Sequence, residues 1–318
     1  MTTEHFTITP LDLEILRLMY RGRPDSLSGI DPRLNASRIS KSLSTNRSRI
    51  SSRMRTWVKS GFLIKYAVWL NPSLFGYRGC WTGVRTARAG YKTEVIRRLG
   101  LIDGVISATE FLGTNISIGV IAQDLHSLRQ RLELIGGLSG VEEVGKPEYW
   151  LSNPVHHKLT PVELRLVKAL RANPTSSLNE AARSVKVSIR TLSKKYTNLI
   201  ENSIVWFQPV MDYRAIAGTV LTFAARLKNS LDADVLTKHL GIRYPLVLRL
   251  NNEQGMLAGP GTTREWAVVL QSASQIDDFL LHAGSIDGVE IEDWKIPVMT
   301  YDFPDSFDWQ LNRLAGRA

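Results

Sequence analysis

The chain has 318 residues, a net charge of +10 and a pI near 9.8, and 43% of its residues are hydrophobic. Because these hydrophobic residues occur along the whole length, a largely disordered chain is excluded. No apolar run approaches the ~20 residues of a membrane span, the first residues lack the features of a signal peptide, and a single cysteine excludes an intramolecular disulfide, so we expect a cytoplasmic protein with no membrane partner.

The sequence contains an internal repeat. Thr-Pro-Leu-Asp-Leu at 9–13 matches Thr-Pro-Val-Glu-Leu at 160–164, and each segment opens a helix with a Thr cap and a Pro in the first turn. Further along, apolar residues of the two copies also match, but their separation in the sequence is nine residues smaller than that of the two Thr-Pro segments. The reason is that only the first copy carries the turn-rich segment 22–32. The match continues to the end of each copy, so we predict one unit used twice.

Each unit is predicted to contain a three-helix segment followed by strands and helices in the order βαββαβ. The fold class is therefore α+β, with two winged helix-turn-helix domains and two ferredoxin-like domains. The predicted boundaries are 1–76 and 157–215 for the winged helices, 77–153 and 216–300 for the α/β domains, and 301–318 for an irregular C-terminal tail.

Helices are expected at about 35–43 and, after the short turn Ser44-Thr45, up to Gly61, with residues 62–70 as an alternating wing strand. The second of these helices has an apolar side that contains Ile50 and Trp57. From Asn35 to Lys65 the sequence has no acidic residue but eight Lys and Arg residues. A solvated helix face normally mixes acids with bases, so this composition favours nucleic acid as the partner.

The predicted DNA contacts lie opposite the apolar side of this helix and at matching places in the second copy. Short hydroxyl side chains allow a helix to approach the major-groove floor, while arginines bond base edges or phosphates. The predicted set is Thr45, Asn46, Arg47, Ser48, Arg49, Ser52, Arg53 and Arg55 in the first copy and Arg190, Thr191, Lys194 and Lys195 in the second.

Three segments together resemble the Lrp/AsnC family of feast/famine regulators: TPLDLEIL at 9–16, GFLIKY at 61–66 and LNP at 70–72. The resemblance spans nearly the whole chain, twice over. It implies a winged helix joined to a ferredoxin-like RAM-type domain, with double-stranded DNA, a small-molecule effector such as an amino acid, and a second copy of the chain in a homodimer as partners. The effector site that it implies lies at the glycine-flanked turns with Thr114, Asn115, Thr262 and Thr263.

Two alternatives share this build. One is a siroheme decarboxylase-like enzyme, whose chemistry needs His and Arg side chains that converge in the α/β domain; His126, His239 and His282 are expected on helices instead. We therefore expect no enzyme, no catalytic residue and no cofactor. The other alternative is a chromatin-coating protein that binds DNA with little sequence preference. His156 and His157 are assigned to a solvated linker, and no metal site is expected.

Overall fold

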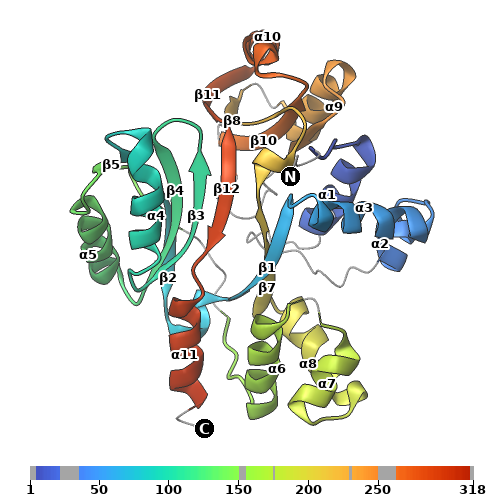
Figure 1. Cartoon of the computed structure of the whole chain (residues 1–318), viewed down its shortest axis with the longest axis vertical. Coiled ribbons are helices and arrows are strands. Elements are labelled where there is room, and N and C mark those ends of the chain that lie inside the picture. Colours follow the sequence, from blue (N-terminus) through green and yellow to red (C-terminus); the bar gives the residue numbers. More distant parts are fainter. Residues whose placement is uncertain are drawn as a thin grey trace. The chain divides into compact units, whose positions relative to one another are not determined.

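The computed structural model describes residues 5–21, 36–149, 155–174, 176–228, 231–249 and 263–315. Over these residues the chain has an α+β fold with two three-helix domains, a four-stranded sheet, a six-stranded sheet and a two-stranded sheet (Figure 1). By their contacts the described residues form two compact units. Unit 1 contains residues up to 64 and from 211 to 299, and unit 2 contains residues 65–210 and those from 300 onward. Each unit therefore combines a winged helix from one copy with a ferredoxin-like domain from the other.

The winged helix of unit 1 consists of three helices around a small apolar core. Ile15, Ile39, Ile50 and Trp57 are almost completely buried between the helices. The last helix begins after the cap Asn46, whose side chain accepts a hydrogen bond from the amide of Ser48. The helices are α1 (Pro10–Arg21), α2 (Ala36–Ser42) and α3 (Arg47–Lys59).

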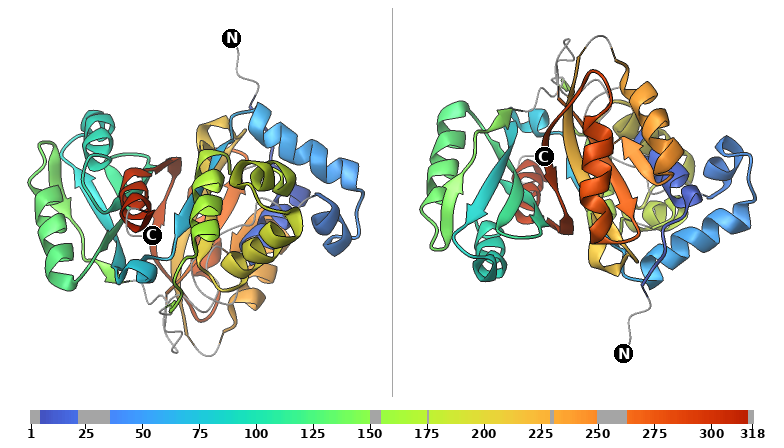
Figure 2. Two further views of the ribbon diagram at one scale, coloured as in Figure 1. Left: turned by 90° about the horizontal axis from the view of Figure 1, so that it is seen from below. Right: turned by 90° about the horizontal axis from the view of Figure 1, so that it is seen from above.

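The sheet of unit 1 has the strand order β11-β8-β10-β9, and its pairs are antiparallel. This order is that of a ferredoxin-like βαββαβ domain. The aromatic rings of Phe223, Trp266 and Phe279 form the centre of its core, under two helices that cover one face (Figure 2). The elements are β8 (Thr219–Leu227), α9 (Ala233–Arg243), β9 (Val247–Arg249), β10 (Thr263–Leu270), α10 (Ile276–Gly284) and β11 (Val289–Lys295).

Unit 2 contains the equivalent sheet of the first copy, with the order β12-β3-β4-β2-β5 and β6 also beside β2. Helices α4 and α5 cover one face, and Val95, Leu99 and Leu128 pack there against the strands. The last strand, β12, extends the sheet at the edge of β3. The elements are β2 (Arg78–Thr86), α4 (Lys92–Leu99), β3 (Val105–Phe111), β4 (Asn115–Ala122), α5 (Leu125–Gly136), β5 (Val141–Val144), β6 (Glu148–Tyr149) and β12 (Pro297–Asp302).

The winged helix of unit 2 differs from the prediction at its strand. Residues 65–70 of β1 (Leu63–Leu70) pair with β7 (Val205–Met211) in a two-stranded sheet, and β1 is buried at all but two positions. The strand predicted at 62–70 is thus present, but the predicted alternation is wrong, because residues 66–70 are all buried. The helices are α6 (Pro161–Ala172), α7 (Leu178–Val185) and α8 (Ile189–Glu201).

The C-terminal segment is a helix rather than an irregular tail. In α11 (Asp305–Ala315), Phe307 and Leu311 are buried, and the hydroxyl of Ser306 accepts a hydrogen bond of 2.8 Å from the amide of Gly104. Arg171 of α6 donates to Asp308 at 2.7 Å and to the carbonyl of Pro304 at 2.9 Å. Contacts with both domains of unit 2 thus hold this helix in place.

Candidate nucleic-acid interface

The orientation of α3 is fixed by a buried carboxylate on α1. Asp12 is fully buried and accepts hydrogen bonds from the indole of Trp57 at 2.8 Å and from Nε of Arg53 at 2.8 Å. A second guanidinium nitrogen of Arg53 also donates to Asp12, and it donates to the carbonyl of Thr7 at 2.9 Å. The guanidinium group lies over the ring of Phe6. Asp12 therefore links two α3 side chains to the first helix.

These contacts give Arg53 a position inside the domain, although the sequence predicted it as a DNA contact. The same arrangement occurs in the second copy. Glu163 is fully buried and accepts hydrogen bonds from Thr160 at 2.8 Å, from Lys195 of α8 at 3.2 Å and from His157 at 3.1 Å. Lys195, also predicted to contact DNA, thus matches Arg53 in sequence and in role, and His157 is bound to the domain rather than solvated in a linker.

Sequence reasoning missed this pair of buried acids, but the repeat contains the signal. Asp12 and Glu163 occupy the same place in the two Thr-Pro segments, and Arg53 and Lys195 occupy the same place in the two third helices. Burial raises the pKa of Glu163, but the hydrogen bonds from Thr160, His157 and Lys195 outweigh it and hold the pKa below its ordinary value. The acid therefore stays ionised.

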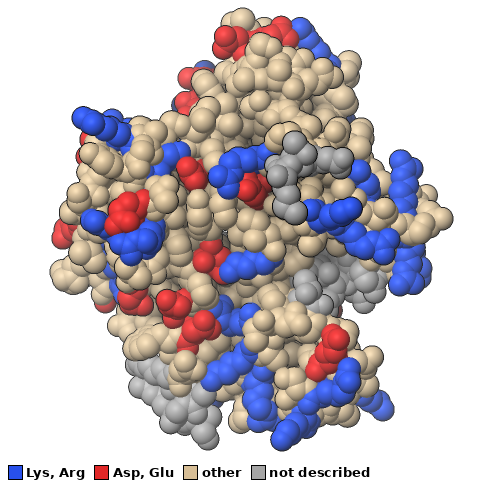
Figure 3. Space-filling view, viewed as in Figure 1, with Lys and Arg blue, Asp and Glu red and all other residues tan. Residues whose placement is uncertain are grey.

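The remaining basic side chains of α3 point away from the core. Arg47, Arg49 and Arg55 are exposed, as are Ser48 and Ser52. None of the three arginines pairs with a carboxylate of a described residue. In Figure 3, Lys and Arg side chains gather where α2 and α3 lie in Figure 1. The face combines exposed cations with short hydroxyls.

Several predicted polar contacts also have a local role. The side-chain oxygen of Asn46 accepts two hydrogen bonds from Ser48, one from the hydroxyl at 2.9 Å and one from the backbone amide at 2.8 Å. Thr45 is half-buried in the turn, where its amide donates to the carbonyl of Ser40 at 2.9 Å. These groups set the start of α3, which leaves the arginines as the side chains with the longest reach.

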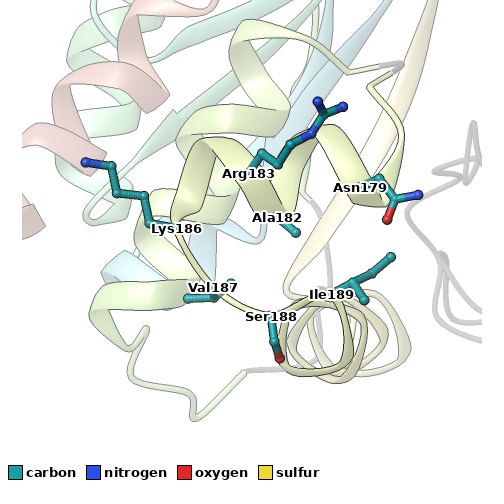
Figure 4. A pocket seen from close by; sticks show the side chains of 7 residues that line it. All are labelled: Asn179, Ala182, Arg183, Lys186, Val187, Ser188 and Ile189. Atoms are coloured by element: carbon teal, nitrogen blue, oxygen red, sulfur yellow. The ribbon is translucent and has the colours of Figure 1, made fainter.

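The second copy presents a smaller basic face. Arg190, Thr191 and Lys194 of α8 are exposed, and Thr191 bonds through its amide to the cap Ser188 at 3.1 Å. A surface hollow of about 630 Å³ lies where α7 ends and α8 begins (Figure 4). Its lining mixes basic, polar and apolar side chains and consists of Asn179, Ala182, Arg183, Lys186, Val187, Ser188 and Ile189.

The predicted effector residues lie at strand ends in separate units. In unit 2 the carbonyl of Thr114 accepts hydrogen bonds from the amide and the hydroxyl of Thr86, at 3.0 and 3.1 Å, and Asn115 is half-buried at the start of β4. In unit 1 the hydroxyl of Thr263 bonds to Glu292. Thr262 lies outside the described residues. Gly113 has a φ of 81°, so the turn before Thr114 requires a glycine.

The three histidines of the α/β domains lie on helices, as expected from the sequence. His126 is exposed on α5, while the rings of His239 and His282 stack at 6.0 Å between α9 and α10. Within the described residues no three His, Cys, Asp or Glu side chains are arranged to hold a metal ion. Nor does any helix there combine the length and apolarity that crossing a membrane requires.

The sequence matches no protein-family model and no curated relative. Similar solved structures do exist. The siroheme decarboxylase NirDL, solved with an iron-uroporphyrin III analogue, is 13% identical with a TM-score of 0.46, and the match covers 97% of this chain and 99% of that one. AsnC of E. coli is 21% identical with a TM-score of 0.31 and covers 49% of this chain and 100% of its own. Chlorite dismutase from Candidatus Nitrospira defluvii is 10% identical with a TM-score of 0.31, covering 76% and 98%.

These matches overturn the expectation that the chain is not an enzyme. Siroheme decarboxylase and chlorite dismutase, whose structures match over 97% and 76% of this chain, are enzymes. Lrp/AsnC regulators match over about half of it. Regulators and enzymes are therefore both among the neighbours of this fold.

Proposed function

We propose that the chain binds double-stranded DNA in a sequence-specific manner, with α3 as the reading helix and α8 as a second contact, and thereby regulates transcription. The observation that carries the proposal is the outer face of α3, where Arg47, Arg49 and Arg55 are exposed without a carboxylate partner among the described residues. Guanidinium groups on a helix of fixed orientation suit both bidentate bonding to guanine and phosphate contact.

The buried residues define which part of α3 faces the groove. Ile50 and Trp57 point into the domain, and Arg53 is held by Asp12. In this arrangement Arg49, in the first half of the helix and flanked by Ser48 and Ser52, is the side chain for a base edge, while Arg47 and Arg55 meet phosphates. Arg53 and Lys195 act by fixing the two third helices rather than by touching DNA.

A small-molecule effector, such as an amino acid, is proposed at the turns that contain Thr114 and Thr263. The support is that Thr114 follows Gly113, whose φ is 81°, directly before β4, and that Thr263 is the first residue of β10. Thermal-shift measurements with the twenty amino acids test this: a stabilising ligand should lose its effect in Asn115→Ala, while Asn198→Ala on α8 leaves it unchanged.

Selection of bound duplexes from a random library, followed by fluorescence anisotropy, tests DNA binding. With the selected site, Arg49→Ala should cost about 1–3 kcal/mol and relax preference at one base pair. Arg55→Ala should weaken all sequences alike and reduce the slope of log K against log salt by about one. Arg129→Ala, an exposed arginine of α5, is the matched control. Unchanged binding by the Arg47, Arg49 and Arg55 triple alanine variant would refute the proposal.

The same measurements separate the alternatives. A chromatin-coating protein would bind the selected site and a scrambled duplex almost equally, whereas a regulator discriminates by about 10³ or more. Tetrapyrrole chemistry has its own readout: titration with iron-uroporphyrin III, the ligand type of the siroheme decarboxylase structure, would shift the porphyrin absorption band on binding. A stoichiometric shift together with loss of duplex discrimination would favour the enzyme.

A further inference from the structure

The exposed arginines of α3 have no arginine opposite them on α8. The alignment that pairs Arg53 with Lys195 also pairs Arg47 with Ile189, Arg49 with Thr191 and Arg55 with Thr197. These three α8 residues are exposed, as the arginines are. Each carries a methyl group and no charge, so the two third helices present different chemistry at the same places.

The cations of α8 occupy other positions. Arg190 and Lys194 are exposed and match Ser48 and Ser52 of α3. They lie about one helical turn apart on the same side of α8, where they suit contact with phosphates. The second helix therefore keeps cations for a polyanion but has none at the position of Arg49, the side chain proposed for a base edge.

The residue that matches Arg49 is Thr191, whose hydroxyl is already engaged. The hydroxyl oxygen lies 2.9 Å from Oγ of the cap Ser188, and the amide of Thr191 donates to the same Oγ at 3.1 Å. Because these hydrogen bonds hold the hydroxyl at the start of the helix, the methyl group of Thr191 is the group that remains for contact with a partner.

Ile189 adds a second apolar group at the start of α8. It is 46% exposed and lines the surface hollow together with Val187 and the cations Arg183 and Lys186 (Figure 4). An exposed aliphatic side chain among cations suits a polyanion that carries apolar groups. In duplex DNA the apolar group at the base edges of the major groove is the C5-methyl of thymine.

We propose that α8 reads thymine through its C5-methyl group, with Thr191 and Ile189 as the contacts, whereas α3 reads guanine through Arg49. This inference rests on the proposed function, in which both helices contact DNA. Its consequence is that the DNA site of this chain contains two unlike elements, one specified by a guanine and the other by a thymine methyl.

Replacement of single thymines by deoxyuridine tests the methyl contact, because it removes that group and changes nothing else in the duplex. The full wild-type chain is titrated by fluorescence anisotropy with the selected duplex and with each deoxyuridine version of it. At one or more thymines the loss of the methyl should raise Kd about fourfold. Since the protein is wild type throughout, no effect can come from misfolding.

Two small substitutions assign this sensitivity to α8. Thr191→Ser keeps the hydroxyl bound to Ser188 but lacks the methyl, and Ile189→Ala shortens the other contact. Each should abolish the effect of deoxyuridine at one thymine, while Arg49→Ala leaves that effect in place. Thr93→Ser, at an exposed threonine of α4, is the matched control and should behave as wild type.

An exchange of the reading residue completes the test. Thr191→Arg should change the preferred base at its position from thymine to guanine, with a change in relative affinity of about tenfold or more. A site with no deoxyuridine-sensitive thymine, or sensitivity that persists in both Thr191→Ser and Ile189→Ala, would overturn this inference while the effect of Arg49→Ala still supports the proposed function. A wild-type chain that selects no duplex at all would refute both.

Discussion

A buried carboxylate determines which basic side chains of each third helix remain free for the proposed contact with DNA. Asp12 and Glu163 each bind one cation of that helix, Arg53 and Lys195, so two side chains that the sequence places on the basic face act within the domain. A buried charge that loses its partner is costly, because the remaining ion keeps its desolvation penalty without compensation.

Replacing Arg53 should therefore affect folding more than replacing any exposed arginine of the same helix. Arg53→Ala is expected to lower the free energy of unfolding by about 3 kcal/mol, since it leaves Asp12 with neutral donors only. Arg49→Ala should stay within about 0.5 kcal/mol of wild type. Urea unfolding followed by circular dichroism measures both. Equal effects of the two substitutions would show that the Asp12 pair does not hold α3.

The second buried acid predicts an acid-sensitive winged helix. Because the pKa of Glu163 is below its ordinary value in the folded chain, its contribution to stability is present above the unfolded pKa of about 4.3 and is lost as pH falls through the folded value. Glu163→Gln should reduce stability at neutral pH and flatten the fall of stability as pH drops below about 4.3. Glu201→Gln, at an exposed end of α8, should keep the wild-type pH profile.

At the scale of elements, the two copies use the same backbone at two special positions. Ser44 and Lys186 have φ values of 48° and 60° in the turn before the third helix, and Gly61 and Ser203 have φ values of 81° and 51° after it. Each pair is separated by the offset that relates the two copies. A non-glycine residue in this left-handed conformation costs about 1–2 kcal/mol. In the turn after the third helix the first copy avoids this cost with Gly61, whereas the second copy has Ser203.

Ser203→Gly should accordingly stabilise the chain, by about 0.5–1 kcal/mol once the greater freedom of glycine in the unfolded chain is subtracted. Ser193→Gly in the middle of α8 should instead destabilise it by about 0.5 kcal/mol, because glycine is the poorer helix former. Opposite signs for the same chemical change are the expected result of thermal unfolding. Destabilisation by both substitutions would contradict the strain at Ser203.

Elements with a local signal could be predicted from the sequence. The helix expected at about 35–43 is α2 (Ala36–Ser42), and the βαββαβ order expected within 77–153 is present as β2, α4, β3, β4, α5 and β5. The errors concern contacts between distant parts of the chain. Nothing in the local sequence indicates that β1 pairs with β7. The spacing of Phe307 and Leu311 is typical of a helix, but the local sequence does not show that this helix packs against α6 and β3.

The same reason limits the prediction of the site. Orientation of α3 follows from its apolar stripe, and so the exposed Arg49 and Arg55 could be identified. Arg53 lies at the border of the basic face, and its role depends on an acid 41 residues earlier in the chain. Periodicity within one helix contains no information about that acid; only comparison of the two copies does.

At the scale of the whole molecule, the two halves of the chain are interleaved rather than placed one after the other. In unit 1, Phe6 exchanges two backbone hydrogen bonds with Ala215 and Ala217, at 2.7 and 2.8 Å. In unit 2, β1 pairs with β7, and Arg171 bonds to the carbonyl of Val68. Both units therefore join residues of the first copy with residues of the second.

It follows that neither half should fold by itself. Fragment 1–154 lacks β7 and α11, and fragment 155–318 lacks β1 and the sheet that covers Phe307, so each exposes apolar surface and an unpaired strand edge. Expressed separately, the fragments should show no cooperative thermal transition; refolded together, they should form a stoichiometric complex with one. As a control, the full chain with a protease site between residues 149 and 155 should be cut into two fragments that remain bound to each other, so that the native mass is unchanged after cleavage. Halves that each unfold cooperatively alone would instead establish two autonomous tandem units, because a domain that contains its whole core needs no partner to fold.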